Sequence, residues 1–106
     1  MLDSSFDRFD WDAGNRKKCR AHGVSLEEIE TALMSGAMML APDTRHSQQE
    51  DRFIAAGRSA NDRYVFIAFT FRVTGKQRAL RPITARYMHR KEAERYEQAR
   101  TQTDKR

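Results

Sequence analysis

The clearest pattern of hydrophobic and polar positions along this chain is the strict alternation in RYVFIAFTFRV, residues 63–73. Every odd-numbered position from Val65 to Val73 is apolar, whereas the even-numbered positions mix Phe66 and Ala68 with polar side chains. A period of two residues predicts a β-strand. One wholly apolar face and one half-apolar face predict a central strand with a helix packed on one side.

A helical period replaces this alternation in SLEEIETALMSG, residues 25–36. Ser25 is a good N-cap, and Glu28 three residues later completes the pattern of a capping box. Gly36 stands where a glycine commonly follows the end of a helix. The residues that share one apolar stripe of this predicted helix are Leu26, Ile29, Leu33 and Met34.

Two further helices are predicted from capping and composition. In DAGNRKKCRAHG, Asp12 is an N-cap candidate and Gly23 a C-terminal stop, which predicts a short basic helix from Asn15 to about His22. The segment YMHRKEAERYEQAR, residues 87–100, has apolar positions on one side and predicts a C-terminal helix.

Other short apolar stretches predict strands, and turn residues separate them. They are FDRFDW (6–11), AMMLAP (37–42), RFIAAGRS (52–59) and QRALRPITAR (77–86). A polar loop of about ten residues, PDTRHSQQED, separates the second strand from the third. The resulting order of one strand, two helices, four antiparallel strands and one helix predicts an α+β fold with a small, mostly antiparallel sheet.

Pro82 lies inside the last predicted strand, where proline is tolerated only at a sheet edge or at a β-bulge. Strict alternation would send Arg81 and Arg86 to opposite faces, because they are five positions apart. A bulge at Pro82 would shift the parity and direct both arginines to one surface. Two guanidinium groups on one surface could bind a phosphodiester bidentately; alternatively, each arginine covers apolar surface and ends in water.

Composition limits the class of protein. The chain has 106 residues and 39% hydrophobic content, so we expect a single domain over residues 1–106, with an ordered core at about 6–100. No segment is as long and apolar as a membrane span, and MLDSSFDRFD does not resemble a secretory signal. Cys19 is the only cysteine, which excludes an internal disulfide. We therefore expect a soluble cytoplasmic protein that does not bind membranes.

The charge is distributed unevenly along the chain. Residues 1–71 carry nine Lys/Arg and eleven Asp/Glu, whereas residues 72–106 carry eleven Lys/Arg and four Asp/Glu. A basic second half produces an oriented field, which favours nucleic acid, an acidic protein or anionic lipid as a partner. The alternative is a charged surface that serves only solubility.

The remaining candidate residues are the histidines and the start of the third predicted strand. His22, His46 and His89 belong to the one residue type whose unperturbed side chain is a proton donor or acceptor near neutral pH, but their spacing is not that of a zinc site. Glu50, Arg52 and Arg58 share one parity, so an acid and two cations would project from one face, either as a site or as a salt-bridged surface.

No phosphate-binding glycine loop, dinucleotide fingerprint, nucleophile elbow or paired-carboxylate metal motif occurs in the sequence. RNA cleavage remains chemically reasonable, because a 2′-hydroxyl can attack the neighbouring phosphorus without metal or cofactor. Such a reaction needs cations for the phosphorane charge and groups that transfer protons.

Three stretches together resemble the BrnT family of bacterial type II toxins. They are WDAGNRKKCRAHGVS (11–25), APDTRHSQQEDRFIAAGRS (41–59) and RPITARYMHRKEAERYE (81–97), and the resemblance extends from about Phe6 to Glu97. It implies a RelE-like fold and a ribonuclease that cleaves messenger RNA and arrests translation. It also implies a BrnA-type antitoxin with a ribbon-helix-helix region, and a complex of toxin and antitoxin that binds promoter DNA.

We accordingly expect a metal-independent endoribonuclease without a cofactor. Arg81 and Arg86 are the candidates for binding phosphate and stabilising the transition state, Arg52 is a further cation, and Glu50 or His22 is the proton carrier. The candidate RNA-binding residues are Lys17, Lys18, Arg58, His89 and Arg90, and Tyr96 is an additional candidate at the site. The alternative is a non-catalytic module that binds nucleic acid or a protein partner and acts as a transcriptional co-regulator.

Overall fold

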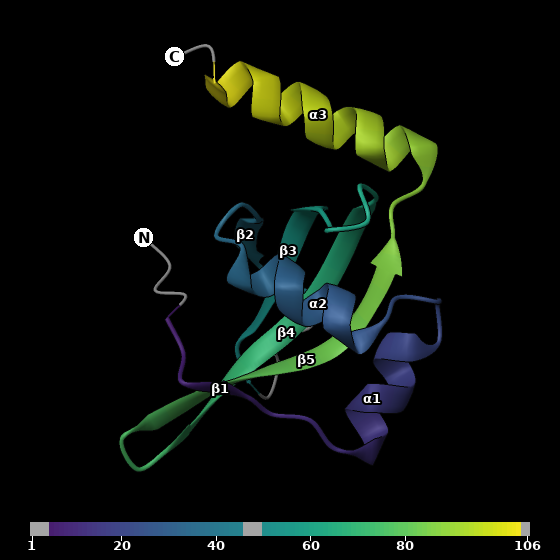
Figure 1. The fold of residues 1–106 in the computed structure, drawn as a ribbon. Coiled ribbons are helices and arrows are strands. Elements are labelled where there is room, and N and C mark those ends of the chain that lie inside the picture. The colour runs from purple at the N-terminus through teal and green to yellow at the C-terminus, as the bar shows by residue number, and fades with distance from the viewer. Residues whose placement is uncertain (1–4, 46–49, 105–106) are drawn as a thin grey trace.

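A computed structural model describes residues 5–45 and 50–104, and within them it has three helices and five strands (Figure 1). The strands lie in one sheet in the order β1-β5-β4-β3-β2; β1 runs parallel to β5 and the other neighbours are antiparallel. This confirms the predicted α+β class. In chain order the elements are β1 (Arg8–Phe9), α1 (Ala13–Arg20), α2 (Leu26–Met34), β2 (Met39–Pro42), β3 (Arg52–Arg58), β4 (Tyr64–Thr74), β5 (Gln77–Tyr87) and α3 (Arg90–Asp104).

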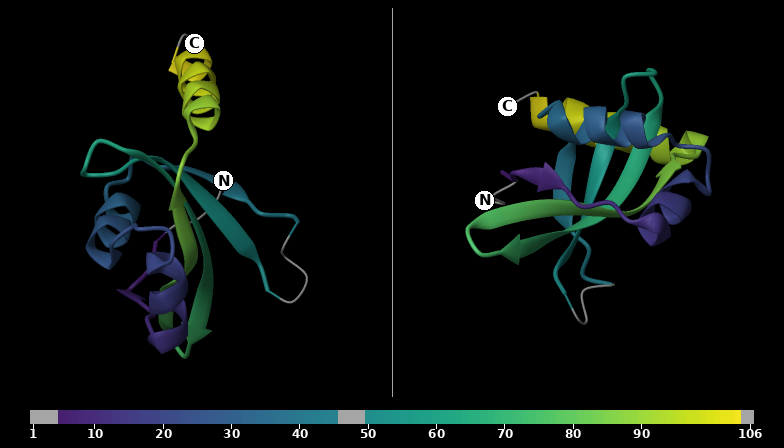
Figure 2. Two further views of the ribbon diagram at one scale, coloured as in Figure 1. Left: turned by 90° about the vertical axis from the view of Figure 1, so that its right-hand side faces the viewer. Right: turned by 60° about the horizontal axis from the view of Figure 1, so that its bottom comes forward.

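Strand β4 is central, as the alternating pattern predicts. Val65, Ile67 and Phe69 are buried on one face, which packs against α1 and α2. The two helices lie on the same side of the twisted sheet (Figure 2, left). The alternation does not predict the end of the strand correctly, since Val73 is 71% exposed. There the β4–β5 hairpin extends past β1, beyond the helices (Figure 1).

Helix α1 begins at Ala13, directly after its N-cap Asp12, and therefore two residues before the predicted start at Asn15. The side chain of Asp12 accepts the backbone N–H of Asn15, and the side chain of Asn15 accepts the backbone N–H of Asp12. The helix ends at Arg20 with Ala21 as its C-cap, two residues before the predicted end at about His22. Gly23 has φ +86° in the turn that follows, where a glycine is the least strained residue. The predicted N-cap of α1 is therefore confirmed, whereas the predicted stop at Gly23 lies three residues beyond the last helical residue.

Helix α2 begins at its predicted N-cap, where Ser25 Oγ accepts the backbone N–H of Glu28 at 3.0 Å. The prediction of a full capping box is wrong, because the Glu28 side chain is buried and accepts the Tyr87 hydroxyl at 2.7 Å. Met34 is also not part of the buried stripe, since it is 71% exposed. Tertiary packing has thus turned α2 so that Glu28, Ile29 and Ala32 are its buried residues.

The predicted β-bulge in β5 is confirmed. Ala68 lies opposite Thr84, but the next residue, Phe69, lies opposite Pro82, so Ile83 is the extra residue on β5. On β4, the partner of Arg81 is Thr70 and the partner of Arg86 is Phe66. Both partners have even numbers, and side chains two apart on a strand share a face. The bulge therefore directs Arg81 and Arg86 to one face of the sheet, the face opposite α1 and α2.

Helix α3 follows β5 and lies across one end of the sheet (Figures 1 and 2). It starts at Arg90, three residues later than predicted. The Tyr96 ring contacts the Tyr64 ring with 5.7 Å between centroids, and Glu92 pairs with β5. Across the described part of the chain, no helix is long and apolar enough to cross a membrane.

Candidate functional site

Three arginines share the face of the sheet that α1 and α2 leave uncovered, which we call the open face. Arg52 on β3 and Arg81 on β5 both lie opposite Thr70 of β4, one on each side, and Arg86 lies further along β5. Cross-strand partners project from the same face of a sheet. Side chains far apart in sequence are thus brought together by strand pairing and by the bulge.

Two neighbouring hollows open on this face. The first, the Phe66 hollow, has a volume of about 390 Å³, and the second, the Arg81 hollow, about 510 Å³. Arg52 lines both, so it lies between them. The Phe66 hollow is lined by His22, Asp43, Arg52, Ile54, Phe66, Ala68, Thr84, Ala85, Arg86 and Glu92. The Arg81 hollow is lined by Asp12, Ala13, Gly14, Asn15, Lys18, Glu50, Arg52, Arg81 and Ile83.

Arg86 is oriented by Glu92 at the start of α3. Its two terminal nitrogens donate to the two carboxylate oxygens of Glu92, each at 2.8 Å, and its guanidinium lies 4.9 Å from the centre of the Phe66 ring. This pairing and the backbone N–H of His89 lower the pKa of Glu92 to about 2, so the carboxylate is ionised at neutral pH. The bidentate pair fixes the guanidinium plane at the edge of the Phe66 hollow.

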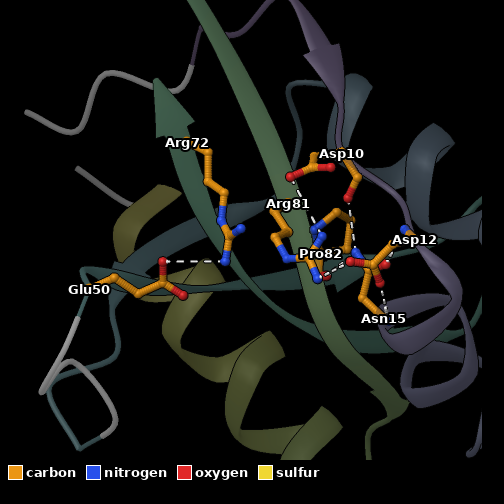
Figure 3. A network of polar contacts seen from close by, with 7 residues as sticks. All are labelled: Asp10, Asp12, Asn15, Glu50, Arg72, Arg81 and Pro82. Carbon is orange, nitrogen blue, oxygen red and sulfur yellow. Dashed lines mark hydrogen bonds and ion pairs between the residues drawn. The ribbon is translucent and has the colours of Figure 1, made fainter. Parts of the chain in front are cut away.

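Arg81 is oriented by the segment that precedes α1 (Figure 3). Its guanidinium donates to Asp12 at 2.7 Å and lies 3.5 Å from a carboxylate oxygen of Asp10. The backbone N–H of Asn15 and the Arg81 guanidinium lower the pKa of Asp12 below its ordinary value. Only 16% of the Arg81 side chain is exposed. Because Asp12 is the N-cap of α1, this ion pair also connects α1 to β5.

Asn15 holds the bulge itself. Its side-chain nitrogen donates to the carbonyl oxygen of Pro82 at 2.8 Å and to that of Asp10 at 2.9 Å, as Figure 3 shows. Asn15 is 4% exposed, and α1 packs against β5 around it. The residue therefore satisfies a buried carbonyl at the point where β5 departs from regular pairing.

Several of the other predicted residues also lie at the hollows. His22, in the turn after α1, lines the Phe66 hollow, and Lys18 lines the Arg81 hollow. Glu50 lines the Arg81 hollow too, with its carboxylate 3.9 Å from Arg72 (Figure 3). The structure thus groups Arg52, Arg86 and His22 at one hollow, and Arg52, Arg81, Glu50 and Lys18 at the other.

The remaining predicted residues lie outside both hollows. Arg58 is at the far end of β3, 3.3 Å from Asp62 and 5.3 Å from the Tyr64 ring centre. Arg90 lies 3.4 Å from Glu94 on α3. Lys17 and His89 are exposed and line neither hollow. His46 is outside the described residues.

Sequence reasoning did not identify Glu92, Thr84 or Asp43 as residues of the site. Glu92 reaches Arg86 across the boundary between β5 and α3, so no single periodicity connects the two residues. Thr84 faces the hollow because it follows the bulge, and it could have been found by applying the shifted parity to every residue after Ile83. Asp43 is buried beside the end of β2, in a segment that the sequence predicts as a loop.

Within residues 5–45 and 50–104, no three His, Cys, Asp or Glu side chains gather where they could hold a metal ion. Metal independence itself stays a prediction. The arrangement offers guanidinium groups, a histidine and carboxylates around an apolar floor, which suits a phosphate diester whose flat bases can stack on such a floor.

Residues 11–92 match a protein-family model described as "Ribonuclease toxin, BrnT, of type II toxin-antitoxin system". The match includes both hollows and every strand except β1, and it ends at Glu92, the partner of Arg86. No curated protein matches the chain.

Proposed function

The chain belongs to the BrnT family of ribonuclease toxins of type II toxin-antitoxin systems, and we propose that it cleaves messenger RNA as a metal-independent endoribonuclease and thereby inhibits translation. The observation that carries the proposal is the common face of Arg52, Arg81 and Arg86, which strand pairing and the β5 bulge create. Cations held in place before the reaction stabilise charge that develops on a transferring phosphoryl group.

In the proposed reaction, the 2′-oxygen of the substrate attacks the adjacent phosphorus and the bond from phosphorus to the 5′-oxygen breaks. The products are a 2′,3′-cyclic phosphate and a free 5′-hydroxyl. One proton leaves the 2′-hydroxyl and one is delivered to the 5′-oxygen. Arg52 and Arg86 stabilise the negative charge of the phosphorane, and Arg81 binds a neighbouring phosphate in the Arg81 hollow.

His22 is our candidate for the proton carrier, because it lines the same hollow as Arg52 and Arg86. An imidazole ring can both accept and donate a proton, as the reaction requires. Glu50 is the second candidate, at the neighbouring hollow. Glu92 does not suit the role of acid, since its pKa of about 2 keeps it ionised.

A type II toxin has a protein antitoxin, and we propose that here it is of the BrnA type, with a ribbon-helix-helix region. An acidic or amphipathic segment of the antitoxin would cover the open face and exclude RNA by charge complementarity. The complex would bind promoter DNA through the antitoxin, and the toxin would act in the cytoplasm.

Growth arrest tests this function. The wild-type chain and the Arg86→Ala variant are induced separately, and messenger RNA ends are mapped by primer extension. We expect arrest and new RNA ends with the wild type, and neither with Arg86→Ala, provided that this variant remains soluble and still binds the antitoxin. Arg95→Ala, an exposed arginine of α3 that lines neither hollow, is the matched control and should behave as the wild type. Loss of solubility in Arg86→Ala would make Arg86 a structural residue.

A second candidate function is a binding module without catalysis. The ion pairs favour it, because Arg86 is held by Glu92 and Arg81 by Asp10 and Asp12, as in a structural role. A module would lose RNA affinity gradually as cations are removed, with a matching change in its salt dependence. An enzyme would lose cleavage through one substitution while its RNA affinity stays nearly unchanged.

A further inference from the structure

The floor of the Phe66 hollow is apolar although it lies on the open face. Ile54, Ala68 and Thr84 form one row across β3, β4 and β5, and Ala56, Phe66 and Arg86 form the next. Helices α1 and α2 lie on the other side of the sheet (Figure 2, left). An uncovered apolar area on a small protein commonly marks a binding surface.

A small side chain contributes to the space. Ala68 lines the hollow between Ile54 and Thr84, two residues along β4 from Phe66. A large residue at position 68 would fill the room between Ile54 and Thr84, since neighbouring strands are only about 4.8 Å apart. The volume of about 390 Å³ is within the range of small-molecule sites, roughly 300–1,000 Å³.

The charge around this floor indicates what occupies it. The guanidinium of Arg86 lies over the Phe66 ring, and Arg52 also lines the hollow. Unpaired RNA bases stack on aromatic rings and on arginine planes, while nearby cations hold the phosphates that join them. An apolar floor with cations at its edges therefore complements a nucleotide.

We propose that the Phe66 hollow is a base-binding subsite, which accepts one unpaired base of the RNA beside the phosphate that is cleaved. Phe66 and the Arg86 guanidinium provide the stacking surface, and Ala68 provides the room. The subsite rests on the proposed ribonuclease function and adds to it a preference for single-stranded RNA. Because the base and the phosphate are bound by adjacent groups, the base determines which phosphate lies between Arg52 and Arg86.

The test measures binding of a short single-stranded RNA with 2′-fluoro sugars, which cannot undergo 2′-hydroxyl attack. The full oligonucleotide is compared, by fluorescence anisotropy, with versions that lack one base at a time. We expect a loss of affinity of about tenfold when one particular base is missing, and much smaller losses at the other positions. Equal losses at every position, or none, would overturn the subsite.

Ala68→Leu tests the location of the subsite, with Ala60→Leu in the exposed β3–β4 turn as the matched control. Ala68→Leu should weaken binding of the full oligonucleotide by about the same factor as removal of that base. It should also eliminate the penalty for removing the base, because coupled changes are not additive. Phe66→Ala should likewise weaken binding of the full oligonucleotide and eliminate this penalty. An unchanged penalty in a folded Ala68→Leu variant contradicts the proposal.

Cleavage of the unmodified oligonucleotide separates a failure of the base-binding subsite from a failure of the ribonuclease function. Cleavage without base-dependent binding removes the subsite and leaves the ribonuclease function intact. If the protein neither binds nor cleaves RNA, both the subsite and the ribonuclease function are wrong. If Ala68→Leu retains RNA affinity but loses antitoxin affinity, the apolar floor is an antitoxin surface and the proposal is wrong.

Discussion

The side-chain nitrogen of Asn15 donates a hydrogen bond to the carbonyl oxygen of Pro82 at 2.8 Å, between residues 67 positions apart in the chain. The bond connects α1 to the bulge of β5, and the bulge determines that Arg81 and Arg86 share a face. A residue of the first helix therefore supports the geometry of a site whose three arginines all come from the sheet.

We predict that Asn15→Ala lowers the free energy of unfolding by about 1–3 kcal/mol, because it leaves the carbonyl oxygens of Pro82 and Asp10 without this donor. Urea denaturation measures the change. The matched control is Asn61→Ala in the exposed β3–β4 turn, which should shift stability by less than about 0.5 kcal/mol. Equal effects of the two substitutions would show that Asn15 does not support the bulge.

The ion pair of Arg86 and Glu92 predicts a specific dependence of stability on pH. The folded-state pKa of Glu92, about 2, lies below its ordinary value of 4.5. A lowered pKa in the folded state stabilises the protein above the unfolded-state pKa, and this contribution is lost as the pH falls from about 4.5 towards 2. The wild type should therefore lose stability over this range more steeply than Glu92→Gln.

Glu94→Gln is the control for this measurement. Glu94 is on the same helix and pairs with Arg90, but both side chains are largely exposed at 60% and 92%. Exposed pairs of this kind contribute little to stability. Its denaturation curves from pH 5 to pH 2 should follow those of the wild type, and identical curves for Glu92→Gln would contradict the assigned coupling.

Cys19 should be unreactive in the folded protein. The thiol is fully buried against β5, and burial raises its pKa to about 11, so it is protonated at neutral pH. Because the thiolate is the nucleophile, a disulfide-exchange reagent should label it slowly in native buffer and rapidly in denaturant. Rapid stoichiometric labelling of the native protein would mean that α1 does not pack as described.

Local rules were sufficient for much of the fold. The cap at Asp12, the N-cap at Ser25 and the buried alternation of Val65, Ile67 and Phe69 depend on neighbouring residues or on one strand, and all are confirmed. The bulge could also be predicted, because proline lacks the N–H that a regular ladder requires.

The errors came from contacts between elements. Glu28 has the spacing of a capping box, but it accepts the hydroxyl of Tyr87, which is 59 residues away. Met34 fits the apolar period of α2, yet 71% of it is exposed. The ion-pair partners of Arg81 and Arg86 could not be predicted either. Each pair joins two elements whose relative placement is determined by the whole core.

The central claim is that Arg52 and Arg86, placed on one face by strand pairing and the bulge, stabilise the transition state of RNA cleavage. The most direct measurement is the cleavage rate of an end-labelled RNA by the purified protein in the presence of EDTA, for the wild type, Arg52→Ala, Arg86→Ala and the control Arg95→Ala. We predict cleavage by the wild type and Arg95→Ala, and rates lower by about 100-fold or more in the other two variants, with RNA affinity nearly unchanged. Cleavage at the wild-type rate by a folded Arg86→Ala variant would contradict the account.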